Sequence, residues 1–277
     1  MNYLQDIDYS TEAAADCFDE LPLWSAPFGL MLLERVPVRT GQTIVDVGCG
    51  TGFLSIELAQ RCGPTSVVIA VDPWTAAIAR LRRKIAFLGL ENIQIIEGDA
   101  AKMGLGDAEV DVLVSNLGIH NFDEPSAVLE ECCRVAKPDA LLCVTTNLAG
   151  HMSEFYEVYR ATLDECGLDV GPLDTHIDRR GTVDSIAELV QKAGFNVIET
   201  ATNRFRMRFA NGSTLLNHYF TRLGFLQGWK SLVAPGLVEL EPFFKQLEQN
   251  LNVFATKQGE LALTIPMAYI EGCKPRV

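Results

Sequence analysis

The chain has 277 residues, of which 48% are hydrophobic, and a formal net charge of −13 at pH 7. This length is enough for one substantial core, or for a core domain with a small appendage. An acidic chain without a basic patch argues against DNA or RNA as a substrate, because nucleic-acid binding depends on neutralising phosphates, and no apolar run of about 18 residues predicts a membrane span.

The N-terminal part, residues 1–40, predicts a helical cap. Two helices are expected in it, one from Thr11 to about Leu21 and one after Ser25. Residues 1–8 include acidic side chains and no basic-then-apolar sequence, so they do not resemble a secretory signal. The eight cysteines of the chain are scattered and form no C-x-x-C pair, which predicts reduced thiols and a cytoplasmic protein.

Residues 41–277 predict one α/β domain, because apolar runs alternate with helical periodicities from residue 43 to residue 148. The expected strands are Thr43–Val47, Ser66–Val71, Ile93–Ile96, Val110–Ser115 and Ala140–Thr145. The expected helices are Phe53–Arg61, Thr75–Leu88 and Pro125–Val135. This alternation predicts a Rossmann-like, doubly wound parallel sheet with helices on both faces. The basic residues of the second helix (Arg80, Arg82, Arg83 and Lys84) are expected to form a solvated face.

Two segments, 149–181 and 211–258, interrupt this pattern as insertions. The first predicts a helix over Ser153–Cys166 and then a polar loop, and the second predicts one or two helices. The remaining elements are a helix over Asp184–Ala193, a strand over Asn196–Phe209 and a strand over Glu260–Glu271, in which Pro266 predicts a bulge or an edge position. The large apolar residues of both insertions predict a lid over the functional site, and a homodimer interface through 211–258 is the alternative.

The run from Asp46 to Gly52, Asp-Val-Gly-Cys-Gly-Thr-Gly, is the most informative motif. A glycine-rich turn between a parallel strand and a helix is typical of a nucleotide-type site, because a ligand can approach a backbone that lacks Cβ atoms. Dinucleotide folds place a third glycine five residues after the first, whereas Phe53 occupies that position here. A carboxylate at Asp46 would repel a pyrophosphate and attract a cationic ligand. The alternative is a tight turn in an unrelated α/β protein.

Polar residues follow the next strands at the edge of the sheet where ligands bind in doubly wound folds. Asp72 lies 24 residues after Gly48, a spacing that suits an acid binding ribose hydroxyls. Trp74 is expected beside an adenine ring, and Asp99, followed by Ala100, is expected to accept a hydrogen bond from an adenine amine. Capping, turn and packing roles are the alternatives for these residues.

The motif and its order resemble class I S-adenosylmethionine-dependent methyltransferases, and the segment Asp19–Ser25 resembles their type-11 group. The resemblance implies S-adenosyl-L-methionine as the cofactor and a seven-stranded sheet whose last strand is antiparallel. It implies cofactor contacts from Asp46, Gly48, Gly50, Gly52, Asp72, Asp99 and Asn116, and Trp74 and Ala100 are expected to join them. Asn116 stands where the family often contacts the amino-acid part of the cofactor. The chain departs from the family at Asp139 and Ala140, where paired glycines are usual.

The candidate general bases are His120, His151, His218, Tyr156, Tyr219 and Glu154, and a base is needed only if the acceptor atom must lose a proton. His120 ranks first because it follows the fourth strand, His151 ranks second, and His218 is a further candidate. The sequence contains no H-E-x-x-H or H-x-E pairing, so no metal site is predicted. Arsenite methylation would need several converging thiolates, which the cysteine spacing does not favour.

The sequence therefore predicts an enzyme that transfers a methyl group from S-adenosylmethionine to a small-molecule acceptor, with no nucleic-acid or membrane partner. A non-catalytic protein that binds S-adenosylmethionine or S-adenosylhomocysteine is the alternative from another class. An NAD-dependent oxidoreductase is a further alternative, which Phe53 and Asp46 disfavour.

Overall fold

The computed structural model describes residues 2–233 and 240–276 and divides into two compact units. The core unit comprises Tyr9–Thr146, Thr182–Thr202 and Met267–Val277. The insertion unit comprises Met1–Asp8, Asn147–Gly181 and Asn203–Pro266. Residues 9–40, which we expected to form a cap with residues 1–8, therefore share a unit with the strand-and-helix core.

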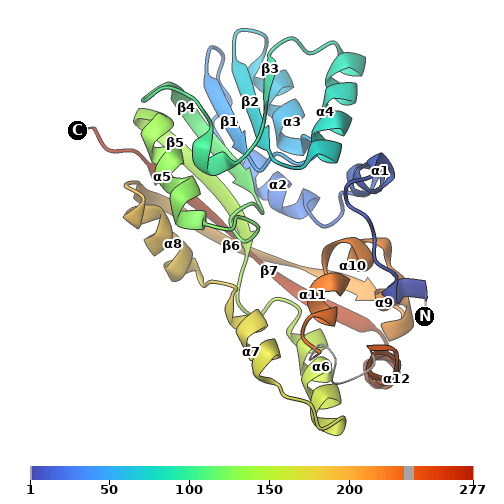
Figure 1. Cartoon of the computed structure of the whole chain (residues 1–277). Helices are drawn as coiled ribbons and strands as arrows, with labels where there is room; N and C mark the ends of the chain where they lie inside the picture. The colour runs from blue at the N-terminus through green and yellow to red at the C-terminus, as the bar shows by residue number, and fades with distance from the viewer. Residues whose placement is uncertain (1, 234–239, 277) are drawn as a thin grey trace. The chain divides into compact units, whose positions relative to one another are not determined.

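A seven-stranded sheet has the order β3-β2-β1-β4-β5-β7-β6 (Figure 1). Its strands are β1 (Thr43–Val47), β2 (Val67–Asp72), β3 (Ile93–Glu97), β4 (Val110–Asn116), β5 (Ala136–Asn147), β6 (Asn196–Phe209) and β7 (Leu261–Cys273). The pairs β1–β2, β1–β4, β2–β3 and β4–β5 are parallel. Directly after β7, the amide of Lys274 donates to the carbonyl of Ala140 and the carbonyl of Lys274 accepts from the amide of Asp139, so two residues of β5 oppose one, as at a bulge between antiparallel strands. The predicted doubly wound sheet with an antiparallel last strand is confirmed.

The helices of the core unit are α1 (Glu12–Glu20), α2 (Ala26–Leu33), α3 (Phe53–Cys62), α4 (Thr75–Leu88), α5 (Pro125–Val135) and α8 (Val183–Lys192), with the 3-10 turn η2 (Ala100–Lys102). The insertion unit contains η1 (Asn2–Leu4), α6 (Ser153–Glu165), α7 (Gly171–Asp178), α9 (Gly212–Asn217), α10 (Tyr219–Gly224), α11 (Leu226–Lys230) and α12 (Leu240–Gln258). None of the helices in residues 2–233 and 240–276 is both long and apolar enough to cross a bilayer.

Several predicted boundaries are confirmed, because strong local signals set them. The helix over Thr75–Leu88 ends at Gly89, whose φ of 64° is left-handed and whose amide bonds back to the carbonyls of Ala86 and Ile85. Strand β5 instead begins at Ala136, four residues earlier than predicted. Asp139 takes a φ of 64° within it, so aspartate adopts the conformation for which glycine is usual.

Several predictions about the later part of the chain and one helix face differ from the structure. Pro266 is not on an edge strand, because β7 lies between β5 and β6, and the carbonyl of Pro266 accepts from the amide of Leu148; a bulge at Pro266 stays a prediction. The polar loop after α6 contains the helix α7, with Pro172 in its first turn. The second insertion contains α9, α10, α11 and α12 rather than one or two helices. The first three have only five or six residues, which is too short for a helical period to show in the sequence. Residues 234–239 lie outside the described residues. Strand β5 is longer than expected. The basic face of α4 is not simply solvated, because Arg80, Arg83 and Lys84 form ion pairs with acidic residues of α1.

The glycine loop after β1 packs on α4 through Gly52. A Cβ at Gly52 would lie 2.2 Å from Leu81 Cδ1, and the φ of Gly52 is 89°. Leu81 is fully buried and shares a cluster with Cys49, Ala70 and Ile78. This glycine is therefore required for the close approach of the loop to α4.

We expect Gly52→Ala to lower the free energy of unfolding by about 2–4 kcal/mol, because it adds overpacking to backbone strain. Urea denaturation measures the change. Gly41→Ala is the matched control, since Gly41 has a φ of 74° and open space around its Cβ position, so it reports strain alone. Equal losses for the two variants would show that the contact with Leu81 is unimportant.

Candidate functional site

The glycine loop turns the chain sharply at the end of β1. The amides of Gly48 and Cys49 donate to the carbonyl of Val71, and the φ values of Gly48, Gly50 and Gly52 are 76°, 53° and 89°. No atom lies within 4 Å of the position that a Cβ of Gly50 would occupy. The backbone at Gly50 is therefore open to a ligand, while Gly52 is covered by Leu81.

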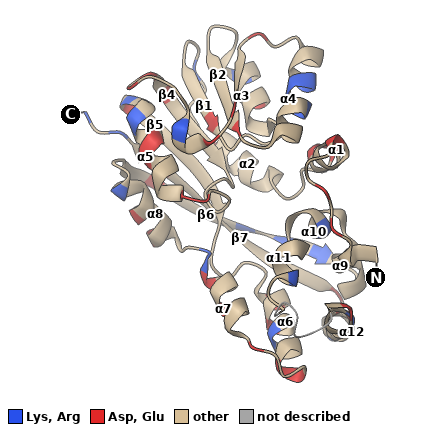
Figure 2. Ribbon diagram, viewed as in Figure 1, with Lys and Arg blue, Asp and Glu red and all other residues tan. Residues whose placement is uncertain are grey.

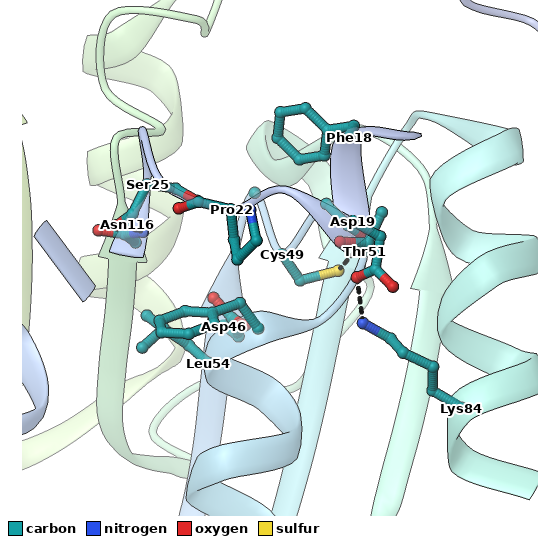
Figure 3. A pocket seen from close by; sticks show the side chains of 13 residues that line it. Phe18, Asp19, Pro22, Ser25, Asp46, Cys49, Thr51, Leu54, Lys84 and Asn116 are labelled. Carbon is teal, nitrogen blue, oxygen red and sulfur yellow. Dashed lines mark hydrogen bonds and ion pairs between the residues drawn. The ribbon is translucent and has the colours of Figure 1, made fainter. Parts of the chain in front are cut away.

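A cavity of about 290 Å³ lies beside this loop (Figure 3). It is lined by residues of the loop, of the N-terminal segment, of α3 and α4, and of the end of β4: Phe18, Asp19, Pro22, Ser25, Asp46, Gly48, Cys49, Gly50, Thr51, Phe53, Leu54, Lys84 and Asn116. All of these residues belong to the core unit. The structure thus gathers four predicted cofactor residues, Asp46, Gly48, Gly50 and Asn116, around one cavity.

Asp46 is a buried acid in the cavity wall. Its side chain is 1% exposed, and Ser55 Oγ donates to its Oδ2 over 2.6 Å. Burial raises the pKa of the Asp46 carboxyl to about 7, the hydrogen bond from Ser55 opposes this rise, and the charge of Asp72 adds to it. A cation placed beside this carboxyl would favour its ionised form.

Asp72 braces the loop from the end of β2. Its Oδ2 accepts from the amide of Gly50 over 2.8 Å, and its Oδ1 accepts from the amide of Trp74 over 2.8 Å. Burial raises the pKa of this carboxyl, and the two backbone hydrogen bonds oppose the rise. Asp72 is absent from the lining of the cavity, so its contact with the site shown here passes through Gly50.

Trp74, Asp99 and Ala100 also lie outside the cavity lining. Trp74 Nε1 donates to the carbonyl of Tyr9 over 2.8 Å, and the Trp74 ring is in edge contact with Phe18, with 5.5 Å between centroids. Asp99 caps η2 by accepting from the amide of Ala101, and Ala100 is buried. The contacts of these residues with adenine stay predictions.

Asn116 has a fixed orientation at the end of β4. Its Oδ1 accepts from Thr145 Oγ1 over 2.7 Å, and its Nδ2 donates to the carbonyl of Ser25 over 3.2 Å. The hydrogen bond from the Thr145 hydroxyl therefore fixes the orientation of the Asn116 amide, and the Nδ2 group of Asn116 links the start of α2 to the end of β4.

Nine of the thirteen lining residues were not predicted site residues, and three of these, Phe18, Asp19 and Lys84, come from the helices α1 and α4. Asp19 bonds to Lys84, and Arg80 Nε donates to Asp19 Oδ2 over 2.8 Å. Burial alone would raise the pKa of the Asp19 carboxyl, but hydrogen bonds from Lys84, Arg80 and Thr51 outweigh burial and hold it below its usual range. The sequence did contain a sign of this pairing, because Glu12, Asp16 and Asp19 are spaced so that they lie on one face of a helix.

The predicted general bases belong to different units. His120 lies half-buried after β4 in the core unit. His151 is 2% exposed in the insertion unit, with its ring centroid 5.8 Å from that of Phe225. His218, the further candidate, lies between α9 and α10 against Phe209 and Tyr219, and burial lowers its pKa.

A polar group within the insertion unit joins Tyr156, a candidate general base, to His176, which sequence reasoning missed. Tyr156 Oη lies 3.0 Å from His176 Nε2, and Trp229 Nε1 donates to the same hydroxyl over 3.4 Å. Burial, with the charges of Arg180 and Arg179, lowers the pKa of His176 to about 4, so its ring is neutral at pH 7. His176 escaped prediction because the segment around it was read as a loop.

In the part of the chain that the structure describes, no group of three His, Cys, Asp or Glu side chains gathers in a metal-binding arrangement. All eight cysteines are free thiols, and four of them (Cys49, Cys62, Cys132 and Cys143) are buried.

The chain is similar in sequence to proteins that are named as methyltransferases. The chain is similar to a demethylmenaquinone methyltransferase of Oceanobacillus iheyensis, with 30% identity over 132 residues, 46% of this chain and 56% of that protein. It is also similar to an arsenite methyltransferase of Halobacterium salinarum, with 27% identity over 58% of this chain and 39% of that protein. The chain thus spans about half the length, or less, of these curated relatives.

Solved structures share the fold. An S-adenosylmethionine-dependent methyltransferase from Aquifex aeolicus matches with a TM-score of 0.53 and 24% identity, covering 71% of this chain and 93% of that one. The YcgJ protein of Bacillus subtilis matches with a TM-score of 0.61 and 16% identity, covering 91% and 99%. The sequence profile described as "Methyltransferase domain" matches residues 39–194. The chain therefore belongs to the methyltransferase-domain family, as a class I S-adenosylmethionine-dependent member.

Proposed function

We propose that this protein transfers the methyl group of S-adenosylmethionine to a small-molecule acceptor. The observation that carries the proposal is the cavity beside the glycine loop, where Gly50 leaves open space and the buried Asp46 offers a carboxyl whose pKa is about 7. When bound, the cofactor supplies a sulfonium methyl group for an in-line displacement. The residues of the chain then have to bind the cofactor, hold it in position and exclude water.

Asp46 and Asn116 suit the polar, charged end of the cofactor. The ionised carboxylate of Asp46 attracts a cationic amino group, and the amide of Asn116 is held in one orientation by Thr145. Asp72 fixes the backbone at Gly50, so it keeps the loop open whether or not its carboxylate also binds the ribose hydroxyls. The sequence around Phe53 and the family membership both disfavour NAD.

An apolar acceptor is favoured over arsenite. Relatives in the family include demethylmenaquinone methyltransferases, and the insertion unit is rich in packed aromatic rings such as Phe155, Phe225 and Trp229. The relative named as an arsenite methyltransferase provides the other acceptor class. Arsenite would require converging thiols, and no cluster of three possible ligands occurs among the described side chains. We propose that residues 149–181 and 211–258 supply acceptor-binding side chains.

His120 is the proposed general base, with His151 as the second candidate. If His120 removes a proton from the acceptor, His120→Ala should lower kcat by about 10²–10⁴ and leave cofactor affinity unchanged. Activity that rises with pH through the pKa of an essential base and is lost in His120→Ala would support this role. An equal fall in cofactor affinity would place His120 in the cofactor site instead, and a small change in kcat would indicate catalysis by proximity.

A turnover assay distinguishes an enzyme from a protein that only binds the cofactor. Purified protein with S-adenosylmethionine is offered an acceptor panel containing a quinol, a phenol, a primary amine and arsenite with thiol. Formation of S-adenosylhomocysteine that depends on an organic acceptor and disappears with Gly50→Val supports the proposal. Turnover with arsenite alone would assign the other acceptor class, and tight cofactor binding without turnover on a wide panel favours the non-catalytic alternative.

A further inference from the structure

The N-terminal segment Tyr9–Ser25 forms one wall of the cavity. Phe18, Asp19, Pro22 and Ser25 all line the cavity, facing the glycine loop. The two ends of the segment are attached to the core, since the carbonyl of Tyr9 accepts from Trp74 and the carbonyl of Ser25 accepts from Asn116. A ligand in the cavity would therefore lie between this segment and the glycine loop.

Between those attachments, ion pairs hold α1 against α4. Arg83 Nη1 donates to Glu12 over 2.6 Å, and Arg83 Nη2 donates to Asp16 over 2.5 Å. One turn further along, Asp19 binds both Arg80 and Lys84. Figure 2 shows the acidic residues on α1 and the basic residues on α4. Opposite charges on two packed helices thus align along the whole length of α1.

The apolar contacts of α1 are few. Its buried residues are only Ala14 and Ala15, which have small side chains, and half-buried Phe18 contacts the ring of Trp74, the N-cap of α4. The side chains of Arg83 and Asp16 are 40% and 36% exposed, whereas that of Asp19 is 10% exposed. The outer pairs are open to solvent ions, and the inner pair reaches the cavity and Thr51. Docking that depends on exposed charges is sensitive to salt.

We propose that residues 9–25 act as an ionic strap that retains the cofactor, and that Arg83 is a positioning residue for this strap. The inference rests on the proposed cofactor site. Arg83 does not line the cavity, so it acts through α1, which carries Phe18 and Asp19 into the cavity wall. Release of the cofactor then requires α1 to separate from α4, which breaks the pairs of Arg83 with Glu12 and Asp16.

The test measures the dissociation rate of S-adenosylhomocysteine from the full chain by stopped-flow displacement. Arg83→Glu should raise the dissociation rate about tenfold, equivalent to about 1.4 kcal/mol, because attraction to two carboxylates becomes repulsion. Arg82→Glu is the matched control, since it makes the same charge change on α4 but Arg82 pairs with Glu97 and not with α1. The double variant Glu12→Lys, Arg83→Glu should restore slow dissociation in part by exchanging the charges of one pair, and Asp16 is left unchanged because it also lies 3.5 Å from Arg80.

Salt provides a second readout that a merely structural role would not give. Raising sodium chloride from about 0.1 M to about 1 M shortens the Debye length from about 10 Å to about 3 Å. Native dissociation should therefore accelerate as the attraction is screened, dissociation of Arg83→Glu should slow as its repulsion is screened, and the two rates should converge. Thermal unfolding of each variant checks that it remains folded.

The outcomes separate this inference from the proposed function. If S-adenosylhomocysteine binds and Gly50→Val prevents binding, yet Arg83→Glu dissociates at the native rate, the strap is overturned and the cofactor site stands. If S-adenosylhomocysteine does not bind the native protein at all, both fail. Faster dissociation in Arg82→Glu to the same degree would show a general charge effect and would also overturn the strap.

Discussion

Asp46→Asn is expected to stabilise the free protein at pH 8 and to weaken cofactor binding at the same pH. Burial raises the pKa of Asp46 to about 7, whereas an aspartate in an unfolded chain has a pKa of about 3.9. Between about pH 4 and pH 7 the unfolded chain therefore binds fewer protons than the folded protein, and the free energy of unfolding falls as the pH rises. Asparagine has no such proton to lose, and its oxygen can still accept from Ser55.

Urea denaturation at pH 4.5 and pH 8 measures this effect. We expect native protein and Asp46→Asn to have similar free energies of unfolding at the lower pH, and the variant to be more stable by about 2–4 kcal/mol at pH 8. Asp123→Asn, which changes an exposed carboxyl in the same unit, is the control and should leave the pH dependence as it is in the native protein. A destabilised Asp46→Asn at pH 8 would mean that the carboxylate is needed for folding.

The same variant should bind the cofactor about tenfold more weakly at pH 8, since a charge-assisted hydrogen bond contributes about 1.5–3 kcal/mol. In the native protein, affinity should rise with pH up to about 7 and then level off, because a cationic ligand binds the ionised carboxyl. Calorimetry in two buffers of different ionisation enthalpy detects the accompanying proton release. Native affinity that is independent of pH would remove Asp46 from the cofactor site.

Gly50→Val is expected to abolish cofactor binding while the protein stays folded. Apart from its chain neighbours, no atom lies within 4 Å of the position that a Cβ on Gly50 would occupy, so the side chain of valine would begin in open space beside the cavity that the ligand needs. The left-handed backbone at Gly50 adds strain of about 1–2 kcal/mol. We expect the dissociation constant for S-adenosylhomocysteine to rise by about a hundredfold or more, equivalent to about 2.8 kcal/mol.

Gly41→Val is the control for Gly50→Val. Gly41 has a φ of 74° and open space around its Cβ position, but it precedes β1 and lies outside the cavity lining. It should show a comparable loss of thermal stability with native affinity for S-adenosylhomocysteine. Native affinity in Gly50→Val would mean that the ligand does not approach the glycine loop.

The sheet and the glycine loop could be predicted because both depend on residues that are close together in the sequence. Apolar runs bounded by turn residues give β1, α4, α5 and β6 their observed limits. The positive φ values at Gly48 and Gly50 follow from the glycines themselves. The convergence of Asp46 and Asn116 follows from topology, since the carboxyl ends of parallel strands meet at one edge of the sheet.

Tertiary pairing could not be predicted in the same way. The ion pairs between α1 and α4 join residues more than sixty positions apart, and either charged face alone is typical of a solvated helix. The hydrogen bond from Trp74 to the carbonyl of Tyr9 could not be predicted for the same reason, because the two residues are distant in the sequence. Helix α7 has only eight residues, too few for its period to stand out among polar neighbours.

The most direct test of the account is an equilibrium titration of the native protein with S-adenosylmethionine, S-adenosylhomocysteine and NAD. If the cavity beside Gly50 is the cofactor site, both sulfur-containing ligands should bind with one site per chain and raise the melting temperature, while NAD should not bind, because Asp46 and Phe53 do not suit a dinucleotide. Tight binding of NAD together with no detectable binding of S-adenosylhomocysteine would contradict the account.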